Sequence, residues 1–180
     1  MRALPLLLAA LVVTACHRQR TTIDDLRIVE FGTFQKTVER GTMAASGSIQ
    51  GQAHAVADAM LLEQTSDIHA KRGTSFGLRV SFSGSPSGAT VPIRAKCLHP
   101  KFTDPATRRS SEVEEWPGIG VMGRSGYVGY TFDNDWELVP GQWTIEVSVG
   151  STSRVEKTFN VSVTPNHAME RTADRRTLHS

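Results

Sequence analysis

The chain has 180 residues, two cysteines, 39% hydrophobic residues and a formal net charge of +2 at pH 7. The length suits a single domain, and the near-neutral charge provides no broad positive field for binding nucleic acid. Two cysteines are too few for a disulfide scaffold, and no apolar run reaches the roughly 20 residues that span a bilayer.

The first segment, residues 1–15, has the pattern of an export signal peptide. Arg2 supplies a positive start, and an apolar run follows at 3–13. The residues Val13-Thr14-Ala15-Cys16 resemble the bacterial lipobox, in which the cysteine receives a diacylglycerol before cleavage. We therefore predict that lipid on Cys16 attaches the protein to a membrane. The alternative is that ordinary signal peptidase cuts the same bond.

The residues after Cys16 bear on the destination of the protein. His17 stands where some bacterial lipoproteins carry the aspartate that retains them at the inner membrane. By that resemblance we expect the outer membrane, with the domain facing the periplasm. Residues 16–25 are polar apart from the cysteine and one isoleucine, and they are predicted to form the lipidated cysteine and a tether.

From Leu26 onward, apolar residues recur with a period of two, which is typical of half-buried antiparallel strands. The stretch 47–62 is ambiguous between a short helix and a loop, and we favour a loop leading into a strand. Turn signals such as Pro117-Gly118 and Pro140-Gly141 separate the runs. The alternation is clearest at 76–82, 91–97, 143–149 and 155–163, and weaker at 26–38, 60–65, 113–122 and 127–132.

This pattern predicts an all-β domain over residues 26–163. Its spacing favours an immunoglobulin-like antiparallel β-sandwich of about 7–9 strands. The tail 164–180 has few apolar residues and no period joins them, so it is predicted to be disordered.

Three strings occur in order along the domain: Gly73-Thr74-Ser75-Phe76-Gly77, Gly129-Tyr130-Thr131-Phe132 and Trp136-Glu137-Leu138-Val139-Pro140-Gly141-Gln142-Trp143. With Ile28-Val29-Glu30-Phe31-Gly32, they resemble a bacterial family of domains of unknown function, the one numbered 3859, over Ile28 to Val163. The family has no established activity, so the resemblance implies a fold and little more. The Pro-Gly-x-Trp string is similar to the last turn of many immunoglobulin-like bacterial modules, which is an analogy at the level of the fold.

One of these strings also spells a hydrolase motif. Gly73-Thr74-Ser75-Phe76-Gly77 matches Gly-x-Ser-x-Gly, which exposes a nucleophilic serine where a strand turns sharply into a helix. Here residues 78–82 alternate as a strand. We therefore expect Ser75 to lie at the entry of a strand and predict no catalytic residue there.

Two patterns are candidates for metal sites. Asp133, Asp135 and Glu137 could offer oxygens to Ca²⁺, but the glycine and the bidentate glutamate of a calcium loop are absent. Cys97-x-His99 is the nearest approach to a zinc pair, and His54 or His69 would have to complete it in space.

We predict no metal ligand and no cofactor. The three carboxylates are expected to form an acidic turn. Cys97 is expected to be a small core residue, and His99 a polar residue at a strand end.

The remaining candidates are a glutamate pair and the aromatic residues. Glu114 and Glu115 are adjacent on a strand, so they point to opposite faces, and we expect both to be solvated. Trp143 lies on the best alternating run and is predicted to be core. Trp116, beside Pro117, is the candidate recognition aromatic.

We interpret the sequence as an uncharacterised envelope lipoprotein without catalysis, whose β-sandwich serves recognition or a structural role. Its partner would be an envelope protein or a glycan, with no nucleic acid. The alternative is a cell-wall or polymer-acting hydrolase that uses carboxylates such as Asp133 and Asp135, brought together in space. A cleft with a perturbed carboxylate or histidine pair would favour the enzyme.

Overall fold

The computed structural model describes residues 21–164. The predicted signal peptide, Cys16 and the tail from residue 165 onward lie outside these residues. The described chain folds into nine strands and one 3₁₀ turn. They are β1 (Thr22–Ala44), β2 (Gln52–Glu63), β3 (Asp67–Ala70), β4 (Ser75–Ser85), β5 (Thr90–Thr103), β6 (Ser110–Val121), β7 (Arg124–Thr131), η1 (Asp135–Glu137), β8 (Gly141–Val149) and β9 (Ser153–Val163).

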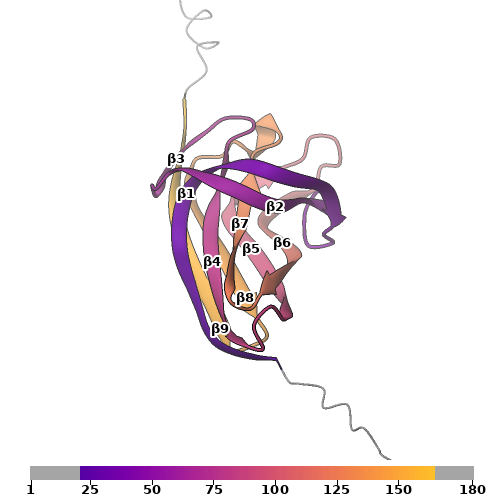
Figure 1. Ribbon diagram of the computed structural model, residues 1–180. Coiled ribbons are helices and arrows are strands. Elements are labelled where there is room, and N and C mark those ends of the chain that lie inside the picture. Colours follow the sequence, from indigo (N-terminus) through magenta and orange to yellow (C-terminus); the bar gives the residue numbers. More distant parts are fainter. Residues whose placement is uncertain (1–20, 165–180) are drawn as a thin grey trace, which may run out of the picture.

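The strands form two sheets that pack face to face, so the predicted all-β sandwich is confirmed (Figure 1). One sheet has the order β2-β1-β4-β7, and the other has the order β3-β9-β8-β5-β6. All pairs are antiparallel except β3, which runs parallel to β9. The sequence analysis missed β3 because its four residues are too few to establish a period.

The core lies between the strands with the clearest alternation. Phe76, Leu78 and Val80 of β4 are fully buried, and they face Trp143 and Ile145 of β8, which are also fully buried. The indole Nε1 of Trp143 donates a hydrogen bond to the carbonyl of Val139 at 3.0 Å. The prediction that Trp143 belongs to the core is therefore confirmed.

Strand β1 is long because it belongs to two ladders in turn. Its first half pairs with β4 as far as Phe34, and its second half pairs with β2. Gly32 lies at the change of partner with φ +138°, and a Cβ there would meet the carbonyl oxygen of Glu63 at 1.9 Å. Only glycine lets the two strands approach so closely. From this point the β1–β2 hairpin bends away from β4 and crosses the upper end of the molecule (Figure 1).

The tip of this hairpin reaches the other sheet. Residues 45–51 connect β1 to β2, and Gly47 forms an isolated antiparallel bridge with Glu115 of β6. The backbone N–H of Ile49 donates to the side chain of Glu114 at 2.7 Å. The interpretation of 47–62 as a loop followed by a strand is thus correct, although the strand begins at Gln52.

Two predicted boundaries were wrong. β1 begins at Thr22, within the segment predicted as the tether. Pro117 and Gly118 lie inside β6 and form no turn. β6 is the outer strand of its sheet, and an outer strand accepts proline because one of its edges needs no ladder hydrogen bond. Within residues 21–164, no helix is long and apolar enough to cross a membrane.

Candidate functional site

A groove of about 940 Å³ lies where the sandwich opens between β6 and β7, under the β1–β2 hairpin. β6 and β7 are the outer strands of their respective sheets, and β2 is also an outer strand. Continuous stretches of all three strands line it: 52–57 of β2, 116–119 of β6 and 126–131 of β7. Successive side chains of a strand point to opposite faces, so a continuous stretch means that the groove runs along the edges of these strands.

The walls of the groove are mainly apolar. Trp116 pairs with the buried Ala95 and therefore projects from the inner face of its sheet. Val128 and Tyr130 project inward from β7, opposite the core residues Leu78 and Phe76. The candidate recognition aromatic Trp116 is thus half-buried and forms part of the groove wall.

Three inner-face glycines lie on β6 and β7, and at two of them the side chains of Ile93 and Phe82 fill the space. Gly118 and Gly120 of β6, and Gly126 of β7, take positions where a sandwich normally carries core side chains. The ring of Phe82 fills the space beside Gly120. At Gly126, by contrast, a Cβ would have its nearest neighbouring atom 4.0 Å away, so the inner face of β7 stays open at this position.

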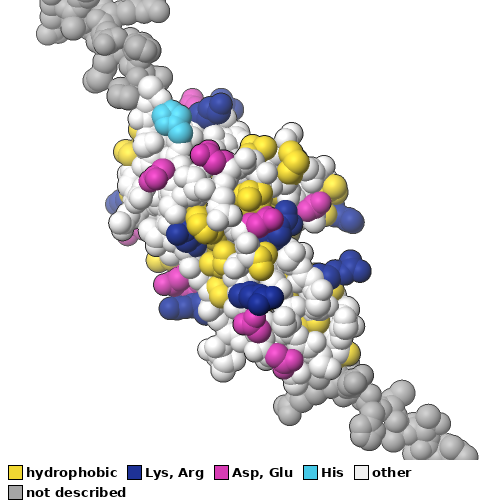
Figure 2. Space-filling model, turned by 60° about the vertical axis from the view of Figure 1, so that its left-hand side comes forward, with side chains coloured by type: hydrophobic (Ala, Val, Ile, Leu, Met, Phe, Trp, Pro, Cys, Tyr) yellow, Lys and Arg dark blue, Asp and Glu magenta, His cyan; other side chains and the backbone are white. Residues whose placement is uncertain are grey.

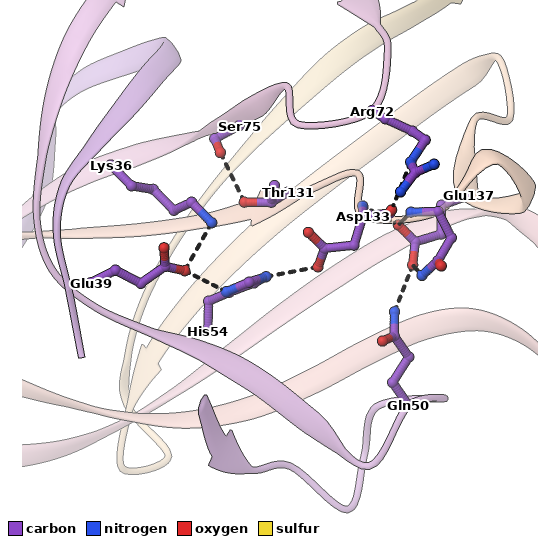
Figure 3. Close-up of polar contacts among 10 residues, drawn as sticks. Lys36, Glu39, Gln50, His54, Arg72, Ser75, Thr131, Asp133 and Glu137 are labelled. Atoms are coloured by element: carbon purple, nitrogen blue, oxygen red, sulfur yellow. Dashed lines mark hydrogen bonds and ion pairs between the residues drawn. The ribbon is translucent and has the colours of Figure 1, made fainter. Parts of the chain in front are cut away.

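At one end of the groove, a histidine connects the β1–β2 hairpin to the segment that follows β7. His54 of β2 lies between two carboxylates, with Nδ1 2.5 Å from Glu39 Oε1 and Nε2 2.7 Å from Asp133 Oδ2 (Figure 3). Lys36 Nζ also contacts Glu39 Oε1 at 2.9 Å. This hydrogen bond is the largest reason why the pKa of Glu39 is lowered, with smaller contributions from the charges of Lys36 and His54. Both ring nitrogens of His54 thus face carboxylate oxygens, one from β1 and one from the segment after β7.

Glu137 supports the same end of the hairpin from below. Its side chain is fully buried and accepts hydrogen bonds from Gln50 Nε2 at 2.7 Å and Asn134 Nδ2 at 3.0 Å. The backbone N–H groups of Asp133 and Asn134 also donate to it, at 2.7 and 3.1 Å. Burial raises the pKa of Glu137, while these hydrogen bonds oppose the rise. All of its acceptor capacity is used in holding the chain, so Glu137 is a structural residue.

Glu114 is buried as well, which corrects the prediction that both glutamates of the pair are solvated. Only Glu115 is partly exposed, with an ion pair to Lys96 at 3.0 Å. Glu114 Oε2 accepts the N–H of Ile49, but Oε1 has no hydrogen-bond partner. The reason is the hairpin tip, which covers the inner face of β6 at this position and removes it from solvent.

His99 faces the unpartnered oxygen of Glu114. Its Nε2 lies 3.9 Å from Glu114 Oε1 and likewise has no hydrogen-bond partner. The ring is stacked between Phe102 and Trp143, with centroid distances of 4.0 and 4.8 Å. Burial lowers the pKa of His99. The prediction of a polar residue at a strand end was therefore wrong: period two was right about its face, but it lies inside β5 and in the core.

Of the other predicted residues, only Asp133 lies at the groove. Ser75 begins β4, is buried, and shares a hydrogen bond with Thr131 at 2.8 Å, so the hydrolase motif sits in a strand. Asp133 lines the groove, but Asp135 is exposed beside Arg72 and is not among the groove residues. Cys97 is fully buried, as predicted.

The candidate metal ligands do not come together. His54 fastens the hairpin, and His69 lies at the surface beside Thr164. In the part of the chain that the structure describes, no group of three or more His, Cys, Asp or Glu side chains could hold a metal ion.

The sequence did not predict that Gly126 borders the groove or that His54 connects the hairpin to Asp133, and Tyr130 was considered among the aromatic residues but not chosen. A usable signal existed in β7, where the string Gly126-Tyr127-Val128-Gly129-Tyr130 combines glycines with aromatic residues. Glycine within a strand often marks a close approach of backbone or ligand. No pattern in the sequence, however, places β2 beside β7.

Comparison with known proteins gives a family and a fold. The domain of unknown function (DUF3859) matches residues 24–161. The chain belongs to this family. It is also similar in structure to an immunoglobulin-like protein from Pseudomonas aeruginosa, with 26% sequence identity and a TM-score of 0.55, over 77% of this chain and 97% of that chain. No curated protein matches the chain. The membership agrees with the resemblance seen in the sequence, and the immunoglobulin-like sandwich is confirmed.

Proposed function

We propose that the protein is a lipid-anchored recognition module of the bacterial envelope, and that the groove under the β1–β2 hairpin binds its ligand without catalysis. The observation that carries this proposal is the groove itself. Its volume of about 940 Å³ and its mainly apolar walls, with a few polar groups at one end, match the usual properties of ligand sites. The contacts of His54 with Glu39 and Asp133 hold the hairpin in place above the groove.

The outer surface offers less support for a docking site. Figure 2 views the side that carries β1 and β9, where hydrophobic side chains are interrupted by charged ones. Lys157 Nζ, for example, lies 4.3 Å from the ring centroid of Phe31. A surface of this kind is ordinary for a soluble domain, whereas the groove is concave.

A non-catalytic role fits the state of the polar groups. In the described residues, no hydroxyl or thiol that lines the groove is hydrogen-bonded to a histidine, which a nucleophile would need. His54 and Glu137 are engaged in holding the hairpin. The hydrolase alternative needs Asp133 and Asp135 together, and only Asp133 reaches the groove.

The anchor is a separate part of the proposal and rests on the Val13-Thr14-Ala15-Cys16 string. With lipid on Cys16, the domain would follow closely, since β1 begins at Thr22. The start of β1 and the hairpin lie at opposite ends of the molecule (Figure 1). An anchored domain would thus carry the hairpin end of the groove away from the membrane, toward the periplasm if the outer membrane is the destination.

The proposal is tested by capture from detergent-solubilised membranes. The wild-type protein is compared with Trp116→Ala and with Gly126→Val, which fills the open space on β7. Ser125→Val is the matched control, because Ser125 is the exposed neighbour on the same strand and does not line the groove. We expect the two groove variants to lose the captured ligand and the control to retain it. Equal capture by all four proteins would contradict the groove as the binding site.

The anchor is tested independently by phase partition. The wild-type protein should enter the detergent phase, and Cys16→Ser should stay in water, because two or more acyl chains give stable membrane attachment. A wild-type protein in the aqueous phase would contradict the anchor and leave the groove unaffected.

A further inference from the structure

The groove is bordered by a strand edge with unpaired backbone groups and by a buried carboxylate. On this basis we propose that the ligand is an extended peptide segment of a partner protein. The segment adds as a strand to the free edge of β7 and places a basic side chain beside Glu114. This inference rests on the proposed function and specifies the class of ligand for the same groove.

The free edge of β7 is the first observation. β7 pairs only with β4 among the described strands, so its other edge carries backbone N–H and C=O groups without a ladder partner. That edge borders the groove over six consecutive residues, 126–131. An extended peptide is the ligand that satisfies such a row of alternating donors and acceptors, as in the binding mode known as strand addition.

Space along this edge is the second observation. A new strand lies about 4.8 Å from its neighbour, so the backbone of β7 has to be reachable. Gly126 leaves room on the inner face beside this edge, since no atom lies closer than 4.0 Å to the position of a Cβ there, and a side chain at this position would project into the groove. Beyond Gly126, the inward side chains of Val128, Tyr130 and Trp116 form apolar walls that would receive every second side chain of the added strand.

Charge is the third observation. The groove has two carboxylates, and that of Asp133 is paired with His54. Glu114 is buried, and in residues 21–164 no lysine or arginine forms an ion pair with it. Its Oε1 has no hydrogen-bond partner. A buried carboxylate in this state is strongly destabilising unless a donor is supplied.

His99, which faces Glu114, limits which kind of group can donate to Glu114 Oε1. His99 Nδ1 lies 2.9 Å from the carbonyl of Pro100, which can only accept, so Nδ1 carries the proton. In the neutral ring Nε2 is then an acceptor that faces the acceptor Glu114 Oε1 at 3.9 Å. His99 therefore cannot supply the missing donor to Glu114 Oε1, whereas the ammonium of lysine or the guanidinium of arginine, entering from the groove that Glu114 lines, would supply it. Charge complementarity thus favours a basic residue in the segment.

The test uses a defined array of short synthetic peptides that alternate apolar residues with threonine. Each sequence is made with lysine, with arginine and with glutamate at a given position, and again with alternate backbone amides N-methylated. We expect the lysine or arginine peptides to bind. Their glutamate and N-methylated counterparts should bind at least about tenfold more weakly. The N-methylated forms keep the side chains but cannot complete the strand ladder.

The site of binding is read by hydrogen exchange on the full chain. A bound peptide should slow exchange of the amides of 126–131, and Gly126→Val should abolish both binding and protection while Ser125→Val keeps them. Glu114→Gln should erase the preference for lysine over glutamate without abolishing strand addition. Melting temperatures of the variants show whether each one is folded.

Each other outcome overturns the inference. If no peptide of the array binds, if N-methylation has no effect, or if protection appears elsewhere, the ligand does not add a strand to β7. If vesicles or glycan fragments bind instead, and Gly126→Val abolishes that binding, the inference fails while the groove remains the recognition site. If Gly126→Val has no effect on any ligand, the proposed function fails too.

Discussion

The interior of the sandwich has two halves that differ in how their space is filled. Between β4 and β8 it is sealed by large side chains, and Phe76 alone packs against four other aromatic rings. Between β6 and β7 three of the inner-face positions carry glycine, and a groove lies there. The two buried glutamates that hold the hairpin also differ: Glu137 accepts four hydrogen bonds, whereas Glu114 accepts one. The sealed half between β4 and β8 is thus fully packed, and the open half between β6 and β7 is where we propose that a ligand binds.

The largest expected effect compares the two tryptophans. Trp143→Ala should lower the free energy of unfolding by about 3–5 kcal/mol, because a large cavity opens in a core that cannot collapse. Trp116→Ala, from a half-buried position beside empty space, should lower it by only about 1 kcal/mol. Denaturant titration of both variants checks the difference. Equal losses would show that the groove is as tightly packed as the core.

The second comparison is between substitutions of the two buried glutamates, Glu137 and Glu114, and their effects on stability. Glu137→Ala leaves two backbone N–H groups without an acceptor and should lower the free energy of unfolding by about 2–4 kcal/mol. Glu114→Gln keeps an acceptor for Ile49 N–H and removes the carboxylate that lacks a second partner, so we expect no loss of stability and a gain of about 1 kcal/mol or more. Urea melts give both values. A large loss in Glu114→Gln would show that its second oxygen already has a partner in the free protein.

The third prediction concerns pH. Burial lowers the pKa of His99 in the folded protein, so below about pH 6.5 the unfolded chain binds a proton that the folded chain does not. This contribution to stability is therefore present above that pH and is lost as the pH falls. We expect the melting temperature to fall on acidification more steeply in wild type than in His99→Gln, with His69→Gln as the exposed control. The raised pKa of Glu137 acts in the opposite direction, and the difference between the variants removes its contribution.

The smallest effect is expected for the chemical reactivity of the Cys97 thiol in the folded protein. Cys97 is fully buried, and burial raises the pKa of its thiol well above the ordinary value. The thiolate is the reactive form, so Cys97 should not react with a thiol reagent until the protein is unfolded. Mass spectrometry after labelling, with and without denaturant, measures this. Rapid labelling of the folded protein would place Cys97 at an opening of the sandwich.

Much of the sealed half could be predicted from the sequence, because its information is local. The alternation at 76–82 and 143–149 identifies the buried faces of β4 and β8, including Trp143 and the strand position of Ser75. Cys97 was placed correctly for the same reason.

The open half could not be predicted in this way, because its contacts join residues far apart in sequence. Glu114 is buried by Ile49, which lies 65 residues away, and Gln50 reaches Glu137 across 87 residues. Both contacts depend on the change of partner of β1 at Gly32, which alternation does not reveal. Trp116 was chosen as a recognition aromatic only because it is an aromatic residue beside Pro117. The structure places it in the groove wall.

The most direct test of the account is site-specific photocrosslinking in the living cell. A photoreactive amino acid is placed at Gln52, which is exposed at the groove, and in a second variant at Thr158, which is exposed on β9 and distant from it. The account predicts a discrete crosslinked product from position 52 that disappears when Gly126→Val is added, and none from position 158. A product that forms equally from both positions, or that survives the filled groove, would contradict it.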